Sequence, residues 1–116
     1  MCIRDRFEGV DEPPVLSINR GFSAPVVVET NRTTADLAFL SAHDDDPFAR
    51  FEAMQQLMVE TLIAAIDGAA VDTAPVIAAI CGTLADDTLD PAFVAEAVML
   101  PSESFLGDQL LSLIHI

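Results

Sequence analysis

A long apolar stripe between residues 48 and 66 constrains the fold of this chain more than any other feature. Its members recur at spacings of three and four along the sequence: Phe48, Phe51, Met54, Met58, Leu62 and Ile66. That period places them on one side of an α-helix. Asp46 followed by Pro47 supplies an N-cap and a first-turn residue, so the helix is expected to begin there. The sequence therefore predicts a core that is built by helix packing, with Met54 and Met58 inside it.

Cap signals predict a helix on each side of this one. Thr33 with Asp36 three residues later is an aspartate version of a capping box, and it predicts a helix that runs to about His43. A third helix is expected from Pro75 to Ala85. The apolar residues that share one face of this third helix are Val76, Ile80 and Leu84.

The last two helices are predicted by the same kind of signal. Asp90-Pro91 is another N-cap and first-turn pair, and the helix that follows is expected to end at Pro101. Ser102 begins a fifth helix, which runs into the end of the chain. Helices of this length joined by short connections favour an antiparallel bundle or an α-solenoid.

The residues before position 31 have a different sequence pattern, without the helical period. Two β-branched stretches, residues 15–18 and 26–29, predict two strands that are joined by a tight connection. A lone hairpin is marginal in water, so we expect these strands to belong to a larger sheet. The predicted fold class is therefore mostly α with a short β arm. The residues that bound the two stretches are Pro13, Pro14, Arg20, Gly21 and Pro25.

Both ends of the chain match the translation of a sequencing adapter. Residues 1–6 are encoded by ATG TGT ATA AGA GAC AG followed by a purine, and residues 111–116 by CTG TCT CTT ATA CAC ATC. The two DNA strings are reverse complements over their shared length, as tagmentation leaves at the ends of library fragments. We therefore expect residues 1–6 and 111–116 to be adapter-derived artefacts and residues 7–110 to be an internal piece of a longer protein.

The charge of the chain excludes two classes of partner. Without the terminal segments the chain holds three basic residues, all arginine, against 18 acidic ones, a net charge of −15. Nucleic acids and anionic membranes are bound through basic contacts to phosphate, so neither is an expected partner. Cys81 is then the one remaining cysteine, which allows no intrachain disulfide and fits a reducing, cytoplasmic compartment. Its thiol is expected to be a small buried apolar group within a helical stripe.

The stretch His43-Asp44-Asp45-Asp46 resembles a ligand set more than any other part of the chain. Hard cations bind several carboxylates, but the loop glycine and the later glutamate of a calcium-binding hand are missing. Carboxylates are also common at helix starts, where they accept N–H bonds and complement the positive end of the helix dipole. We therefore interpret the cluster as a helix cap and keep cation binding as an alternative.

Residues 7–110 contain no complete catalytic motif. They hold a single histidine, so neither an H-E-x-x-H zinc motif nor a Ser–His–Asp triad can be complete within them, and no phosphate-binding glycine loop occurs. We therefore predict no catalytic residue and no metal ligand in this segment.

Five short strings occur along the chain in an order that points to a known family. They are Arg-Gly-Phe-Ser-Ala-Pro-Val within residues 15–29, Asp-Leu-Ala-Phe-Leu at 36–40, Asp-Asp-Pro-Phe-Ala-Arg-Phe-Glu-Ala at 45–53, Leu-Asp-Pro-Ala at 89–92 and Leu-Pro-Ser at 100–102. Together they resemble the bacterial aminopeptidase N family, the alanyl aminopeptidases of the gluzincin class. The resemblance covers most of residues 13–110. One departure is Phe51, which stands where the family's D-x-F-x-R-W-[DE]-A pattern has tryptophan.

This resemblance implies a zinc-dependent enzyme that removes N-terminal residues from peptides. In that family, H-E-x-x-H and a downstream glutamate bind the metal, and a G-[AG]-M-E-N strand holds the free amine; neither motif occurs in this chain. The resemblance also implies that residues 7–31 end an immunoglobulin-like β-sandwich and that residues 32–110 begin a solenoid-like helical C-terminal domain. Zinc, peptide substrates and contacts with the catalytic domain and the rest of the C-terminal domain would belong to the parent enzyme.

The segment is then expected to dock the helical domain onto the sandwich. Gly21 permits a tight turn, Phe22 fills the interface between sheet and helices, and Pro25 starts a strand or lies at its edge. The Arg50 side chain is expected to pair with acids near the start of its own helix or across the junction. The residues that we assign to this structural junction are Arg20, Gly21, Phe22, Ser23, Ala24, Pro25, Arg50 and Phe51.

A second class of function stays open at this point. The chain would then be a stand-alone acidic helical module that binds or scaffolds other molecules without enzymatic activity. Its helix content and acidity support this alternative. An H-E-x-x-H motif upstream in the same reading frame would favour the peptidase.

Overall fold

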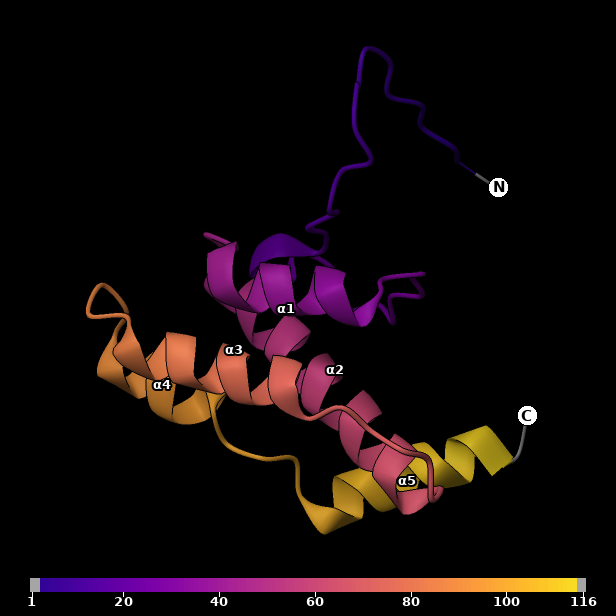
Figure 1. Cartoon of the computed structure of the whole chain (residues 1–116). Coiled ribbons are helices and arrows are strands. Elements are labelled where there is room, and N and C mark those ends of the chain that lie inside the picture. Colours follow the sequence, from indigo (N-terminus) through magenta and orange to yellow (C-terminus); the bar gives the residue numbers. More distant parts are fainter. Residues whose placement is uncertain (1–2, 115–116) are drawn as a thin grey trace.

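The computed structural model describes residues 3–114 and the side chains of residues 3–111 (Figure 1). It consists of an N-terminal arm, residues 3–33, and five α-helices. The central helix is α2, which contacts each of the other helices and the arm. A single 3₁₀ turn, η1, interrupts the arm. The elements in chain order are η1 (Arg20–Phe22), α1 (Thr34–His43), α2 (Pro47–Ile66), α3 (Ala74–Ala85), α4 (Pro91–Ala97) and α5 (Glu103–Ile114).

Side-chain caps fix where the helices begin. The Thr33 hydroxyl accepts the Asp36 N–H at 3.2 Å, and the Asp36 carboxylate accepts the Thr33 N–H at 3.1 Å, which completes the predicted capping box of α1. The carboxylate of Asp46 accepts the Ala49 N–H at 2.9 Å at the start of α2. At α4, Asp90 plays the same role. The predicted starts of these three helices are confirmed.

The core lies where α1, α2 and α3 meet. Met54 and Met58 are each 1% exposed, which confirms their predicted place in the core. Further along the same stripe, Ile66 is 58% exposed. The other buried apolar residues of the core cluster are Leu37, Leu40, Ala53, Leu57 and Ala79.

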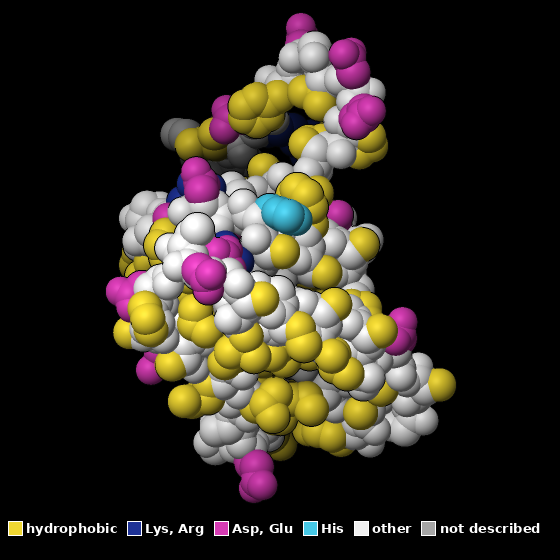
Figure 2. Space-filling view, turned by 60° about the vertical axis from the view of Figure 1, so that its left-hand side comes forward, with side chains coloured by type: hydrophobic (Ala, Val, Ile, Leu, Met, Phe, Trp, Pro, Cys, Tyr) yellow, Lys and Arg dark blue, Asp and Glu magenta, His cyan; other side chains and the backbone are white. Residues whose placement is uncertain are grey.

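One prediction about α3 was wrong, and its predicted apolar face is buried only in part. Val76 and Ile80 do pack against the core, but Leu84 is 59% exposed. Cys81, expected to be buried, is exposed. Helix α3 carries apolar residues on every side, so its period could not tell which side faces inward. Figure 2 shows hydrophobic side chains gathered on the surface over the region of α3 and α4.

The predicted β arm is not seen in residues 3–114. Residues 15–18 and 26–29 form no strand there, and the end of an immunoglobulin-like sandwich is therefore not seen either. The arm's backbone bonds are local, such as the Phe22 N–H to the Asn19 carbonyl at 3.1 Å. A strand needs a neighbour that completes its hydrogen-bond ladder, and the described part of the chain contains no neighbouring strand. The side chain of Val27 is accordingly 93% exposed.

Helix α4 ends at Ala97, earlier than the predicted end at Pro101. The Gln55 side-chain amide of α2 donates to the carbonyls of Ala97 at 3.4 Å and Met99 at 3.1 Å. This side chain thus satisfies carbonyls at the helix end that no later turn of helix reaches. Ser102 accepts the Phe105 N–H at 3.2 Å, which confirms it as the cap of α5. Among residues 3–114, no helix is both long enough and apolar enough for a membrane span.

Candidate functional site at the arm–helix junction

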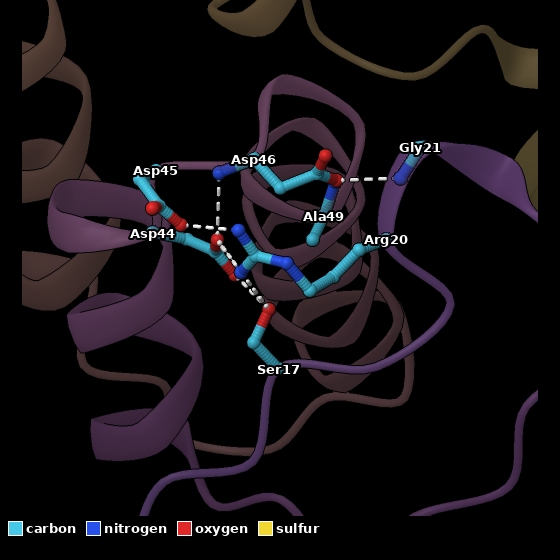
Figure 3. A network of polar contacts seen from close by, with 7 residues as sticks. All are labelled: Ser17, Arg20, Gly21, Asp44, Asp45, Asp46 and Ala49. Carbon is cyan, nitrogen blue, oxygen red and sulfur yellow. Dashed lines mark hydrogen bonds and ion pairs between the residues drawn. The ribbon is translucent and has the colours of Figure 1, made fainter.

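The arm is bound to the connection between α1 and α2 (Figure 3). One guanidinium nitrogen of Arg20, Nη1, donates to Asp44 Oδ1 at 3.0 Å and to Ser17 Oγ at 3.1 Å. The other, Nη2, donates to Asp45 Oδ1. The Ser17 hydroxyl donates in turn to Asp44 Oδ2. We call this group of residues the arm clamp: Ser17, Arg20, Gly21, Asp44, Asp45 and Asp46.

Asp46 joins the arm to the start of α2. Its Oδ2 atom accepts the Gly21 N–H at 2.8 Å and the Ala49 N–H at 2.9 Å. One carboxylate oxygen therefore caps the helix and binds the arm. Gly21 has φ +63°, a left-handed conformation that glycine adopts without steric cost, and this turn directs its N–H toward Asp46.

Burial makes Asp44 the residue of the clamp that most needs partners. Its side chain is 1% exposed, whereas that of Arg20 is 46% exposed. A buried carboxylate is costly unless it is paired and hydrogen-bonded. Asp44 meets that requirement with three donors: the Arg20 guanidinium, the Ser17 hydroxyl, and the Asp46 N–H at 2.9 Å.

The clamp also changes the acidity of Arg20, Asp45 and Asp46. The hydrogen bond from Arg20 holds the pKa of Asp45 below its usual value, and the same bond raises the pKa of Arg20. The pKa of Asp46 is lowered first by the Gly21 N–H and then by the Ala49 N–H. Each of these interactions favours the ionised carboxylate.

Acid is therefore expected to release the arm. A carboxyl whose folded pKa is depressed stabilises the fold above its unfolded pKa, about 3.9 for aspartate. That contribution is lost as the pH falls through the lower folded pKa values of Asp45 and Asp46. The chemical shift of the Gly21 amide, followed by NMR from about pH 6 to about pH 2, should show the transition below about 3.9. An unchanged transition in an Asp45→Asn/Asp46→Asn double variant would contradict this assignment.

The structure brings some of the predicted junction residues together and separates others. Phe22 is 52% exposed, and its ring lies 5.0 Å from that of Phe48 in α2, centroid to centroid. The sheet that Phe22 was expected to meet is not seen in residues 3–114. Phe51 lies with Phe22 along one groove between the arm and α2. In the arm, Ser23 follows η1, the Ala24 N–H donates to the Asn19 side chain at 3.1 Å, and Pro25 is exposed.

Arg50 lies apart from the arm clamp. Its buried side chain faces the end of α3, where a guanidinium nitrogen is 3.8 Å from the Asp86 carboxylate. Arg32 donates to the Thr30 hydroxyl and to the Gln56 side chain, each at 3.1 Å. With Arg20, all three arginines of residues 7–110 thus join one segment of the chain to another.

Two features of this site were not predicted from the sequence. Ser17 was not recognised as a member, and Asp44 and Asp45 were interpreted as helix caps rather than partners of Arg20. The sequence did offer one signal for this pairing. Three adjacent carboxylates attract a cation, and residues 7–110 contain only three arginines that could supply it. In the part of the chain that the structure describes, no group of three or more His, Cys, Asp or Glu residues could hold a metal ion, zinc included.

Comparisons with known proteins agree with the helical architecture. Residues 34–115 match the family described as "Domain of unknown function (DUF3458_C) ARM repeats". The chain is also 40% identical, over 104 residues, to a protein of Caulobacter vibrioides named Aminopeptidase N. That match covers 88% of this chain but only 12% of the relative's length.

These matches confirm the resemblance to aminopeptidase N. They also show that this chain corresponds to part of the helical C-terminal domain of that protein. The match spans all five helices, including the α1–α2 connection that holds the arm clamp. The chain therefore belongs to the DUF3458_C family of ARM-repeat domains.

Proposed function

We propose that this chain is a non-catalytic structural segment of a zinc-dependent aminopeptidase, which docks the helical domain onto the domain that precedes it. The arm clamp is the observation that carries this proposal. It binds the residues just before the ARM repeats to the first connection between helices, through the guanidinium and backbone of η1.

The geometry of the clamp suits a docking role. Arg20 binds two carboxylates at once and Gly21 a third, so the arm is held at several points and its direction is fixed. A guanidinium donates in a planar fork, which adds directional specificity to its charge. A domain attached to the arm would therefore leave the helices at a defined angle. We propose that the boundary between the two domains lies between residues 31 and 32.

The chemistry of the parent enzyme belongs to residues outside this chain. We propose that the parent is a cytoplasmic enzyme that cleaves N-terminal residues from peptides and binds its zinc with ligands elsewhere. The relative's name, Aminopeptidase N, and its 40% identity support the cleavage of N-terminal residues. The residues of this chain would act on peptides only indirectly, by holding the helical domain in position.

A chimera tests this proposal. The matched 104-residue segment of the Caulobacter protein would be replaced by that of this chain, and hydrolysis of L-alanyl-p-nitroanilide would be measured. We expect the chimera to hydrolyse this substrate and the 116-residue chain to leave it intact. Zinc content and a cooperative thermal transition show whether the chimera has folded. A folded, zinc-loaded chimera without activity, or an active 116-residue chain, would contradict the proposal.

The docking role needs a variant of its own. Arg20→Met removes the charge and both ion pairs, whereas Arg20→Lys keeps the charge but loses the planar fork. We expect the thermal midpoint of the chimera to fall with Arg20→Met and to fall less with Arg20→Lys. Identical midpoints in all three proteins would favour the stand-alone helical module, in which the arm has no domain to position.

A further inference from the structure

Helix α3 has two apolar faces, and the fold covers one of them. The inner face packs toward α1 and α2 through Ala79 and Thr83, which are buried, with Val76 and Ile80 beside them. The outer face is exposed over the whole length of the helix. Its residues are Ala74, Ile77, Ala78, Cys81, Gly82, Leu84 and Ala85.

The outer face of α3 is suited to another helix. Ile77 is 56% and Leu84 is 59% exposed, while the residues between them are small and would let a neighbouring backbone approach closely. No charged residue occurs from Ala74 to Ala85. A helix that is apolar on all sides is normally buried on all sides. Contiguous apolar surface of this kind marks an interaction site.

Charge at the margins decides what kind of helix fits. Asp72 precedes α3 and Asp87 follows it, so both ends of the outer face carry an exposed carboxylate, whereas Asp86 pairs with Arg50 of α2. Two copies of this chain, each with a net charge of −14, would bring like charges together at that contact. The complementary surface is an apolar stripe with lysine or arginine near its ends.

We infer that a further helix of the parent chain, apolar along one side and basic near its ends, packs on the outer face of α3. This rests on the proposed function, because it takes the occupant from the parent protein. Two observations favour that source over a separate partner. The chain spans 12% of the relative's length, and the matched family consists of ARM repeats, in which stacked helices bury one continuous core. Because α3 packs on α1 and α2 with its inner face, a helix on its outer face would extend the same apolar core.

Cys81 lies in the middle of this face and is a built-in probe. In a Cys2→Ser background, the rate of maleimide labelling of Cys81 would be measured by mass spectrometry in the 116-residue chain and in the chimera. We expect labelling in the chimera to be about tenfold slower or more, because a packed helix excludes the reagent. An Ile77→Glu substitution, which places a charge in the contact, should restore fast labelling.

A matched control separates local covering from general protection. Asp67, at the end of α2, is exposed and lies outside the face. In an Asp67→Cys/Cys81→Ala variant, the new thiol should label at similar rates in the chain and in the chimera. Equal labelling of Cys81 in both proteins would overturn the inference. Equal labelling of Cys81 can be told apart from failure of the proposed function, because the latter would be seen as a folded chimera without peptidase activity.

The basic ends of the occupant have their own test. This chain contains no lysine, so a carbodiimide cross-link from Asp72 or Asp87 to a lysine in the chimera must join it to the rest of the parent. We expect such a cross-link, and its partner peptide should be a predicted amphipathic helix. Protection of Cys81 in a concentration-dependent dimer of the 116-residue chain would assign the face to a second copy and overturn the inference.

Discussion

Substitution of Leu57 by alanine is expected to lower the free energy of unfolding by about 2–5 kcal/mol. Leu57 lies in α2, is 1% exposed, and belongs to the cluster in which α1 and α3 meet this central helix. The loss combines the transfer free energy of the removed carbons with the cost of the cavity that they leave. Urea unfolding of the chain, followed by circular dichroism at 222 nm, measures the difference.

Leu84 provides a matched control for Leu57. It has the same side chain and also lies in a helix, but it is 59% exposed. Leu84→Ala should change the free energy of unfolding by no more than about 0.5 kcal/mol. Equal losses in the two variants would show that α3 packs on the core with a different face from the one described.

Substitution of Arg20 by methionine is expected to release the arm while the helices stay folded. The change removes the donors that hold Asp44 and Asp45 and leaves the buried Asp44 carboxylate with fewer partners. The Gly21 amide, which donates to Asp46, should then exchange with solvent several-fold faster. Hydrogen exchange measured by NMR reports this amide individually.

The Ala49 amide is an internal reference for that experiment. It donates to the same Asp46 oxygen but belongs to α2, so its exchange should stay slow in the variant. Arg6→Met removes the same charge from an exposed position in the arm and should leave both amides unchanged. If Gly21 and Ala49 accelerate together, Arg20 stabilises the whole fold rather than the arm alone.

The helix starts could be predicted because their causes are local. The capping box of Thr33 and Asp36, and the cap formed by Asp46, satisfy backbone groups within three residues of the cap. Such signals are complete within a short window of sequence, and the structure confirms them. The end of α4 was predicted less well, and the carbonyls at that end accept hydrogen bonds from Gln55, more than 40 positions away in the sequence.

The predictions that failed concern features that depend on distant parts of the chain. The valines of residues 26–29 favour a strand, but a strand forms only beside another strand, and the described residues supply none. The exposure of Cys81 could not be read from α3, where every side is apolar. The arm clamp joins positions about 25 residues apart, and no periodic pattern links Arg20 with Asp44.

The two hydrogen bonds from Gln55 have a mechanical consequence for everything that follows α4. They bind α2 to the stretch where α4 gives way to α5, so one side chain helps to set the direction in which the chain leaves that helix. In a stack of repeats, each unit is placed by its neighbour, and a small rotation early in the stack is carried to every later unit. Gln55 acts near the beginning of such a stack. A small change in the orientation of the chain at Ala97 and Met99 would therefore displace each later helix by a larger distance than the one before it.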